Sequence, residues 1–494
     1  MSFSLLTEPW LPLISTDGRR QAVSLLDALL EPGRWRGLDG ANPIETLSLH
    51  RLLLAICHRA IGPSVDPRTD LLARWPRSAL EAYLDRWANN FDLLHPQTPF
   101  LQVPALAEAN LSPSPWSRLA HDRASGAARM IWDHSIDDQP ERQPFAQMAR
   151  LLIAHLQFTP GSLVKALRTS AVRGPACSLL LMLPLGDSLQ ETMALNLCTQ
   201  AKQRHVLDLP TWERPPLRLE DLRKPRDEVI EGPAHRYTFL SRAVLLLPDG
   251  AGISELLYAE GLKTGEDTTP DKDPMAATIT LKKGTMALLL SEQKAFWRDF
   301  PALHGSKGYT AAEVVNHALE LRKEPHRNGR LAMLAGGMLC DKAKILFWRL
   351  EQRQLSPEVL CSQALITASD RALELAEETG SEFSKSVYGL CSAWLKRGGD
   401  KDPDPKDVRG LQDSIQAGAL FWGSLEPAFW VFIQRLADSG DPDTCLSEWR
   451  EELRASVRDA WRHATLSLGM DSRALAAAGA LEHRQRKILA ALKA

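Results

Sequence analysis

The sequence predicts an α+β protein: a large mixed α/β N-terminal domain with small sheets and long loops, followed by a C-terminal helical bundle. At 494 residues the chain exceeds the size at which one hydrophobic core keeps growing, so at least two domains are expected. Residues 205–290 combine many prolines with short apolar runs, whereas residues after about 357 form amphipathic stretches separated by helix breakers. We therefore expect domains over residues 1–356 and 357–494.

The first elements are a predicted hairpin and a helix. An apolar strand is stiffened by Pro9 and Pro12, and the Asp-Gly pair at residues 17–18 is favoured turn chemistry for a hairpin. A second short strand leads into a helix that begins at Ser24. Asp27, three residues further on, is placed to complete a capping box.

Helices and small strands are expected through the rest of the N-terminal domain. Two prolines and an alternating pattern predict a loop and a strand over residues 95–103, and weak periodicity predicts a long loop over 104–145. Short apolar runs predict a small mixed sheet within residues 205–290. Helical periodicity predicts helices over residues 43–61, 78–91, 145–156, 189–197, 311–321 and 341–354.

The C-terminal third has the pattern of a helical bundle. Between residues 446 and 468, Leu446, Trp449, Leu453 and Val457 recur at helical spacing, which predicts one buried face. Glycine, aspartate and proline clusters separate this stretch from its neighbours. The amphipathic stretches cover residues 361–378, 382–396, 411–437, 446–468 and 472–492.

Composition excludes several classes of protein. The formal net charge of −2 excludes a uniformly basic nucleic-acid coat but is compatible with a local basic groove. No run of about 18 apolar residues predicts a membrane span, and the N-terminus has no signal-peptide pattern. The 7 cysteines form no CxxC pair and are typical of reduced thiols, so we expect a cytoplasmic protein without a structural zinc site.

The common catalytic signatures are absent from the sequence. There is no phosphate-binding loop, dinucleotide fingerprint, HExxH motif or nucleophile elbow. The nearest approach to a metal cluster is His134 with Asp133, Asp137 and Asp138, and such a group in a polar loop is typical of a solvated turn. We predict no catalytic residue, no metal and no cofactor, and hence no enzyme.

The first candidate recognition segment is the loop Pro160-Gly161-Ser162. Glycine allows a ligand to approach the backbone closely, and hydroxyl groups suit phosphate oxygens. Basic side chains that suit phosphate contacts follow at Lys165, Arg168 and Arg173. The alternative interpretation is a helix end stopped by Pro-Gly and followed by a solvated basic loop.

The second candidate is Lys263, which lies between Gly261 and Gly265 in a predicted loop. A lysine in this position can reach into a groove as a point charge. The alternative is an ordinary surface lysine in a turn.

The third candidate is the segment from Gly336-Gly337 to Cys340, Asp341 and Lys342, which we place between two helical segments. A double glycine followed by a projecting polar tip can insert between base pairs as a wedge. The alternative is a glycine pair that caps a helix.

The fourth candidate is Met130-Ile131-Trp132-Asp133, an aromatic group within a polar loop. An aromatic side chain in such a loop can stack on an unpaired base. The alternative is that Trp132 attaches the loop to the core.

Several strings in this sequence resemble the CasA family, the large subunit of the type I-E CRISPR surveillance complex Cascade. The resemblance covers nearly the whole chain. Its most specific strings are Leu5-Leu6-Thr7-Glu8-Pro9-Trp10-Leu11-Pro12, His95-Pro96-Gln97-Thr98-Pro99-Phe100-Leu101-Gln102, Ile131-Trp132-Asp133-His134-Ser135, Arg173-Gly174-Pro175 and residues 336–348.

The resemblance implies a fold and a function. Members of the family join a mixed α/β domain to a C-terminal four-helix bundle. They are non-catalytic subunits in antiviral defence that recognise the protospacer-adjacent motif in double-stranded DNA. They help to open the duplex so that the CRISPR RNA can pair in an R-loop. The implied partners are target DNA, CRISPR RNA, other Cascade subunits and the effector helicase–nuclease, with no membrane.

The resemblance also assigns roles to the four candidate segments. The family's glycine loop falls on residues 160–162, its minor-groove lysine on Lys263, and its wedge on Asp341 and Lys342. Its loop near the 5′ end of the guide RNA falls on residues 130–133. This chain has fewer glycines in the first loop, a lysine in place of the wedge amide, and no cysteine cluster within residues 205–290.

Two other functions remain open. A stand-alone nuclease or helicase requires carboxylate clusters or a phosphate loop, and the sequence has neither. A helical protein-interaction scaffold that does not read DNA is compatible with the C-terminal third. Salt-dependent, motif-selective duplex binding distinguishes the DNA-recognition subunit from the scaffold.

Overall fold

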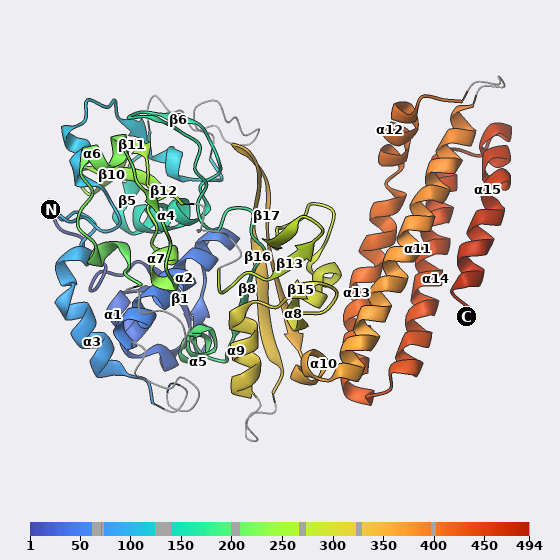
Figure 1. The fold of residues 1–494 in the computed structure, drawn as a ribbon, viewed down its shortest axis with the longest axis horizontal. Helices are drawn as coiled ribbons and strands as arrows, with labels where there is room; N and C mark the ends of the chain where they lie inside the picture. Colours follow the sequence, from blue (N-terminus) through green and yellow to red (C-terminus); the bar gives the residue numbers. More distant parts are fainter. Residues whose placement is uncertain are drawn as a thin grey trace. The chain divides into compact units, whose positions relative to one another are not determined.

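The computed structural model describes residues 1–61, 71, 74–123, 140–198, 208–265, 273–322, 329–396 and 402–493. The chain divides into two compact units (Figure 1). The first unit contains residues 1–293 and 308–354 and mixes helices with small sheets, and the second contains residues 294–307 and 355–494 and is helical. The predicted α+β fold class is confirmed.

The segment of residues 294–307 belongs to the helical unit, although the sequence suggested a place in the N-terminal domain. Its aromatic side chains explain this assignment. The ring of Trp297 lies 5.0 Å from that of Phe429, and the ring of Phe300 lies 5.6 Å from the same phenylalanine. Aromatic burial of this kind outweighs proximity along the chain.

The predicted opening hairpin and helix are confirmed. Strands β1 (Leu11–Ser15) and β2 (Arg20–Val23) pair antiparallel, and β3 (Trp35–Leu38) pairs on the other side of β1. Helix α1 (Leu25–Leu30) begins with a capping box: the Ser24 hydroxyl accepts the N–H of Asp27 at 3.1 Å, and the Asp27 carboxylate accepts the N–H of Ser24.

Helix α2 (Pro43–Ile61) runs through the core of the first unit and has the predicted bounds. It packs against α3 (Arg77–Arg86), α4 (Phe145–Phe158) and α7 (Pro233–Tyr237). The core includes the charged side chain of Arg51 in α2, which is fully buried and forms an ion pair with Asp273 at 2.9 Å.

Residues 205–290 contain strands, as predicted, but these strands belong to several small sheets, each antiparallel or parallel, and not to one mixed sheet. The long hairpin of β10 (Arg242–Asp249) and β11 (Gly252–Glu260) packs on α4, and β11 also pairs with the short strands β4 (Ser114–Pro115) and β5 (Gln143–Pro144). Strands β9 (Asp227–Glu228) and β12 (Lys263–Thr264) pair in parallel. A further antiparallel sheet contains β13 (Thr278–Leu281), β14 (Gly284–Ala287) and β15 (Tyr309–Thr310).

The helix predicted over residues 341–354 is wrong, because this segment is a strand. Strands β8 (Leu181–Leu185), β16 (Leu331–Asp341) and β17 (Lys344–Leu355) form one sheet in the order β17-β16-β8. Hairpin pairing with the adjacent β16, which is itself paired with the distant β8, overrides the helical pattern here. The strand predicted within residues 95–103 is also wrong, since these residues form turns that reach β10 through the Val103 N–H.

The other elements of the first unit are short. The helix predicted over residues 78–91 is divided into α3 and a 3₁₀ turn, and the described part of the predicted loop at 104–145 contains two further 3₁₀ turns. These elements are α5 (Leu189–Asn196), α6 (Leu219–Arg223), α9 (Glu313–Arg322), β6 (Val164–Lys165), β7 (Thr169–Ser170), η1 (Pro32–Arg34), η2 (Ala88–Phe91), η3 (Pro104–Glu108), η4 (Trp116–Leu119) and η5 (Thr211–Glu213).

The second unit is a helical bundle. Its long helices α11 (Gln363–Leu395), α13 (Ala417–Ser439), α14 (Pro442–Ser467) and α15 (Ser472–Ala491) pack side by side, and α11 joins two predicted helices into one. The shorter elements are η7 (Phe296–Asp299), α8 (Pro301–His304), α10 (Pro357–Cys361) and α12 (Pro405–Ile415). None of the described helices has both the length and the apolar character required to cross a membrane.

Candidate nucleic-acid interface

The loop of residues 160–162 directly follows α4 and is held from inside the protein. The guanidinium of Arg242, a residue only 1% exposed, donates from Nη2 to the carbonyl oxygens of Pro160 and Ser162, both at 3.3 Å. Its Nη1 donates to the carbonyl of Val172 at 2.7 Å. One buried cation therefore fixes the backbone on both sides of the β6–β7 hairpin.

Two close approaches bring the segment at Arg173-Gly174 against this loop. A Cβ on Gly174 would lie 2.4 Å from the carbonyl oxygen of Gln157, so this position accepts only glycine without rearrangement. A Cβ on Gly161 would lie 3.0 Å from Nε of Arg173. The exposed Arg173 side chain thus lies beside the glycine loop.

The β6–β7 hairpin is anchored by a buried carboxylate. Glu260, which is fully buried, accepts the backbone N–H groups of Ala166 at 2.7 Å and Leu167 at 2.9 Å. Glu260 is also the register partner of Arg242 on the β10–β11 hairpin. Two buried residues of opposite charge therefore hold the glycine loop and the neighbouring hairpin from the same end of one sheet.

Arg168 joins three segments through their backbone. Its Nη1 donates to the carbonyl of Leu222 at 2.6 Å, and its Nη2 donates to the carbonyl of Gly261 at 2.7 Å. These bonds engage the guanidinium that the sequence suggested for phosphate contact. By contrast, Lys165 and Arg173 are exposed and make no ion pair with another described residue.

Lys263 is at the surface on β12. A Cβ on Gly261 would lie 2.2 Å from the carbonyl oxygen of Leu240, so glycine allows this segment to pass close to the start of β10. The Lys263 ammonium forms an ion pair with Asp227 at 2.6 Å, and both side chains are 54% exposed. Such an exposed pair is worth about 0–1 kcal/mol, so a ligand phosphate can replace the carboxylate at little cost.

The glycine pair lies inside β16, where Gly336 and Gly337 are buried, rather than in a loop or a helix cap between helices. A Cβ on Gly336 would lie 2.3 Å from the carbonyl oxygen of Arg349, and one on Gly337 would lie 2.2 Å from that of Leu179. These glycines therefore allow close backbone approach from both sides, which is a known role of glycine within strands.

The turn between β16 and β17 presents Asp341 and Lys342 to solvent. Lys342 has a φ of +53°, the left-handed conformation of a tight turn. Cys340 is only 7% exposed, and its N–H donates to the Ser178 hydroxyl at 3.2 Å. A hydrogen bond with the Cys177 thiol and burial raise the pKa of Cys340. The accessible part of this segment is therefore its tip.

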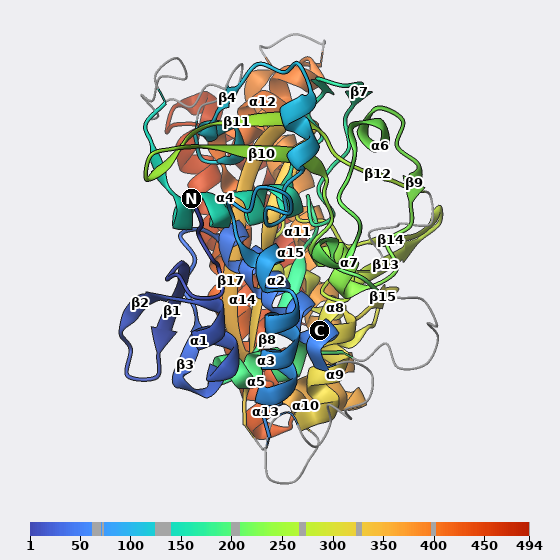
Figure 2. The same ribbon diagram turned by 90° about the vertical axis from the view of Figure 1, so that its left-hand side faces the viewer.

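These contacts bring the predicted segments to one end of the first unit. Figure 1 places the β16–β17 turn and β6 at the same end of the fold, and Figure 2 shows β7, α6, β9 and β12 grouped on one side. The Arg173-Gly174 segment connects them, because the following Ser178 donates its N–H to Met338 of β16 at 2.9 Å. The predicted guide-RNA loop at Met130, Ile131, Trp132 and Asp133 lies outside the described residues.

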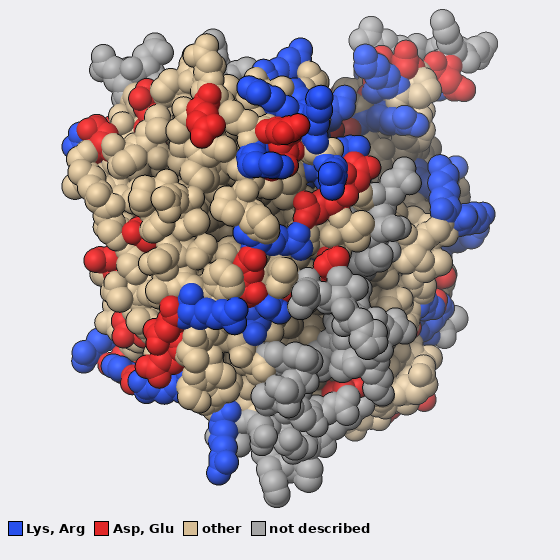
Figure 3. Space-filling model, turned by 60° about the vertical axis from the view of Figure 1, so that its left-hand side comes forward, with Lys and Arg blue, Asp and Glu red and all other residues tan. Residues whose placement is uncertain are grey.

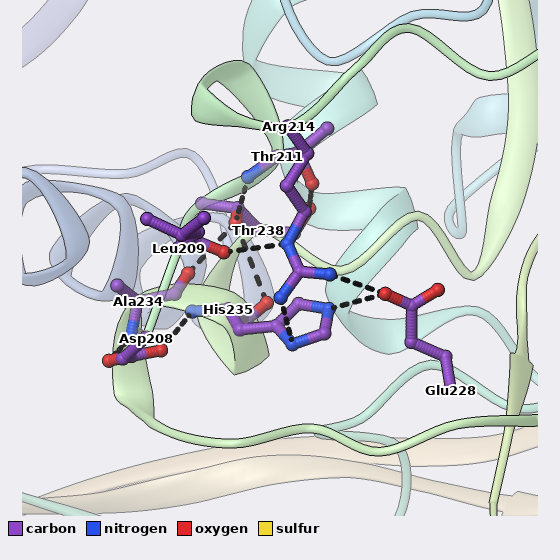
Figure 4. Close-up of polar contacts among 8 residues, drawn as sticks. All are labelled: Asp208, Leu209, Thr211, Arg214, Glu228, Ala234, His235 and Thr238. Atoms are coloured by element: carbon purple, nitrogen blue, oxygen red, sulfur yellow. Dashed lines mark hydrogen bonds and ion pairs between the residues drawn. The ribbon is translucent and has the colours of Figure 1, made fainter. Parts of the chain in front are cut away.

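A pocket of about 490 Å³ lies beside Leu262 and is bordered by a charged cluster. Figure 4 shows the Arg214 guanidinium between the Glu228 carboxylate and the ring of His235, whose Nδ1 lies 2.9 Å from Nη2 of Arg214. Burial, with the charges of Arg214 and Arg236, lowers the pKa of His235 to about 3. This cluster is satisfied internally and supports β9. Among the described residues no group of three or more His, Cys, Asp or Glu side chains is arranged to hold a metal.

Lowered histidine pKa values predict loss of stability in mild acid. Burial lowers the pKa of His50, His58 and His121 to about 4. The unfolded chain takes up protons below pH 6.5, whereas these folded histidines stay neutral until about pH 4. The contribution of these histidines to stability is therefore greatest above pH 6.5. Between pH 6.5 and pH 5, each of them lowers the free energy of unfolding by up to about 2 kcal/mol.

Urea unfolding at pH 7 and pH 5 measures this loss. His235→Gln keeps a side-chain acceptor for Arg214 but removes one titrating group. We expect the difference in unfolding free energy between the two pH values to be smaller in this variant than in the wild type. If the difference is equal in both proteins, His235 does not contribute to the loss of stability in acid, which contradicts its lowered pKa.

Sequence reasoning missed Arg242 and Glu260, the two residues that hold the loops. The available signal was their position, since each is a charged residue at the inner end of an apolar strand. Buried charges require partners, so such residues point to backbone groups that need fixing. The sequence alone does not reveal which loops those partners come from.

Comparisons with known proteins identify the family of this chain. The model of the family described as CRISPR-associated protein Cse1 matches residues 4–460. The chain belongs to the Cse1 family. A CRISPR-associated protein CasA/Cse1 of Thermus thermophilus is 34% identical over 508 aligned positions, covering 99% of this chain and 98% of that protein.

Solved Cse1 structures share the fold. The crystal structure of Thermus thermophilus CasA matches with a TM-score of 0.86 and 32% identity, covering 99% of this chain and 100% of that one. A chain from a structure described as a CRISPR RNA-guided surveillance complex matches with a TM-score of 0.80, covering 99% of each chain. At 22% identity, that second match concerns the fold alone.

Proposed function

We propose that this chain is the non-catalytic large subunit of a type I-E Cascade complex and recognises the protospacer-adjacent motif in double-stranded DNA. The glycine loop at residues 160–162 and Lys263 contact the duplex, and the turn at Asp341 and Lys342 wedges between base pairs. Opening of the duplex then allows the CRISPR RNA to pair and form the R-loop.

One observation carries this proposal: three segments separated by up to 180 residues of chain meet at one end of the first unit. The glycine loop lies against Arg173, Arg168 bonds to Gly261 near Lys263, and Ser178 bonds to β16 close to the turn. Family membership supports the same assignment. Buried Gly336, Gly337 and Cys340 support the turn rather than touch DNA, and Arg168 supports the loops.

Duplex binding by the assembled complex tests the proposal. The chain is assembled with its Cascade partners and guide RNA, and affinity is measured for duplexes that differ only in the base pairs beside the guide-matched sequence. We expect the wild type to discriminate among motifs, and Lys263→Ala and Lys342→Ala each to reduce this discrimination about tenfold or more, within the usual cost of one wrong base pair.

Arg19→Ala is the matched control, because Arg19 is also an exposed turn cation paired with an aspartate, at 3.1 Å from Asp17. It is expected to leave discrimination unchanged. If neither lysine variant differs from this control, the site assignment is incorrect. If the wild-type complex shows no motif preference at all, the result favours the alternative function of a helical protein-interaction scaffold.

Two further roles belong to the proposal. Residues 130–133 contact the CRISPR RNA, and the assembled complex recruits the effector helicase–nuclease in the cytoplasm. Strand cleavage by this chain alone, with divalent metal added, would contradict its assignment as a non-enzyme.

A further inference from the structure

We infer that Arg223, Lys224 and Arg226 form a phosphate-binding strip that holds the duplex DNA beside Lys263. We call these three residues the α6 strip, because they lie at and just after the end of helix α6. The inference rests on the proposed function and adds a contact surface for the DNA backbone.

Backbone contacts place the α6 strip next to the segments already described. Arg168 bonds both to the carbonyl of Leu222, which directly precedes the strip, and to that of Gly261, two residues before Lys263. At the other end of the strip, Asp227 pairs with Lys263 through both the parallel strand register and the ion pair. The strip is therefore held against the Lys263 segment at both ends.

The cations of the α6 strip form no close ion pair with a described carboxylate. The pKa of Asp221 is lowered mainly by its hydrogen bonds with Arg218, and the charge of Arg226 is only a minor cause. Carboxylates are present nearby, but Asp221 pairs with Arg218, Asp227 with Lys263 and Glu228 with Arg214. Arg223, Lys224 and Arg226 are exposed and make no ion pair with any other described residue. Each cation in the strip is thus available for a ligand.

Two further exposed cations of the first unit have the same sign of charge. Figure 3 shows Lys and Arg side chains in the upper centre of one face, with Asp and Glu side chains between them. The exposed Lys165 and Arg173 also lack ion-pair partners among the described residues. Because the whole chain carries a net charge of −2, this local excess is a feature of position rather than of composition.

The chemistry of the strip suits the DNA backbone rather than base edges. Exposed arginines and lysines on a short, turn-bounded segment contact phosphate oxygens without sequence preference. We therefore expect the strip to strengthen binding to all duplexes equally, whereas Lys263 and the turn discriminate among motifs.

Salt dependence measures this contribution directly. The triple variant Arg223→Gln/Lys224→Gln/Arg226→Gln is assembled into the complex, and duplex affinity is measured over a range of salt concentrations. The slope of log K against log salt is negative, and each lost phosphate contact reduces its magnitude by about 0.9, so we expect the slope to become less steep by about 2 to 3. Affinity for motif and non-motif duplexes should fall by the same factor.

A matched control removes three cations from another exposed part of the first unit. Arg19→Gln/Arg20→Gln/Arg36→Gln changes residues on the β1–β2–β3 sheet, which Figure 2 places away from α6, β9 and β12. The control should keep the wild-type slope. If the α6 triple variant has the same slope as the control, or if it changes the ratio between motif and non-motif duplexes, the inference is wrong.

The two proposals fail in distinguishable ways. If wild-type complexes bind duplex DNA without motif preference, the proposed recognition function fails, but the slope still tests the strip. If motif preference is present and the slope is unaffected by the triple variant, only the strip is rejected. All three side chains are exposed, so the unfolding free energy is expected to change little and serves as the folding check.

Discussion

Replacing Arg242 with methionine is expected to abolish most motif discrimination while leaving the exposed DNA-contacting residues unchanged. The substitution removes the donors that hold the carbonyls of Pro160, Ser162 and Val172. It also removes one of the positive charges near Glu260, its buried register partner, and leaves Arg168 close to that carboxylate. We expect about 3–5 kcal/mol of lost stability, the usual cost of breaking a buried charge arrangement from one side.

Two measurements separate a positioning role from simple unfolding. Urea unfolding gives the loss of stability. Duplex binding below the unfolding transition gives the motif ratio, which is the affinity for a duplex with the preferred motif divided by that for a duplex without it. Arg242→Lys keeps the charge but not the fork of donors, so we expect most of the stability and only part of the discrimination to return. A folded Arg242→Met variant with the wild-type motif ratio contradicts the positioning role.

Glu260→Gln tests the other half of the same arrangement. The carboxylate accepts two backbone N–H groups, one on each oxygen, from Ala166 and Leu167. An amide has only one oxygen, so its NH₂ group must face an N–H donor. We expect the β6–β7 hairpin to be loosened and the variant to show faster amide exchange at Ala166 or Leu167 than the wild type.

Replacing Arg51 with methionine is expected to destabilise the first unit by about 3–5 kcal/mol, because it leaves Asp273 as an unpaired buried carboxylate. Both side chains are 0% exposed and lie 2.9 Å apart. The Arg51 guanidinium also lies over the ring of Tyr237 at 4.2 Å and donates to the side chain of Gln157 at 2.9 Å. Urea unfolding measures the loss.

The pair offers its own control. Arg51→Met/Asp273→Asn removes both charges, so we expect it to recover part of the stability lost in the single variant. Arg20→Gln breaks an ion pair with Asp39 that is 76% exposed on the arginine side, and it is expected to cost less than about 1 kcal/mol. A loss in Arg51→Met no larger than that of Arg20→Gln would show that the buried pair is energetically neutral.

Arg51 also connects the core to the candidate interface. Its partner Gln157 lies at the end of α4, immediately before the glycine loop, and the Gln157 carbonyl is the atom that excludes a side chain at Gly174. Gln157 therefore contacts both Arg51 in the core and the segment beside the glycine loop. Arg51→Met should alter the motif ratio less than Arg242→Met, because it removes no bond to the loop itself.

Local patterns predicted the elements whose stability comes from nearby residues. Ser24 and Asp27 form their capping box within one helical turn, and α2 has the bounds that its apolar face indicates. The segment of residues 341–354 was predicted incorrectly for the converse reason. Its strand depends on backbone approach to β16, which Gly336 permits and which periodicity within the segment does not report.

For the candidate site, too, some features were predicted from the sequence and others were seen only in the structure. Residue type and family resemblance pointed to the glycine loop, Lys263 and Lys342. Burial then showed that Cys340 faces inward, and hydrogen bonding showed that Arg168 is engaged by backbone carbonyls. Neither fact can be predicted from the sequence pattern, because the type of a polar residue does not indicate whether it is exposed or buried.

The sequence by itself indicated the family and the α+β fold class, and it predicted the segments that we propose for recognition. Only the tertiary structure decided that Arg242 and Glu260 hold those segments together and that Arg223, Lys224 and Arg226 have no ion-pair partner among the described residues. The physical reason is that a charge acts through its distance from other charges and dipoles. Those distances are set by contacts between residues far apart in the chain.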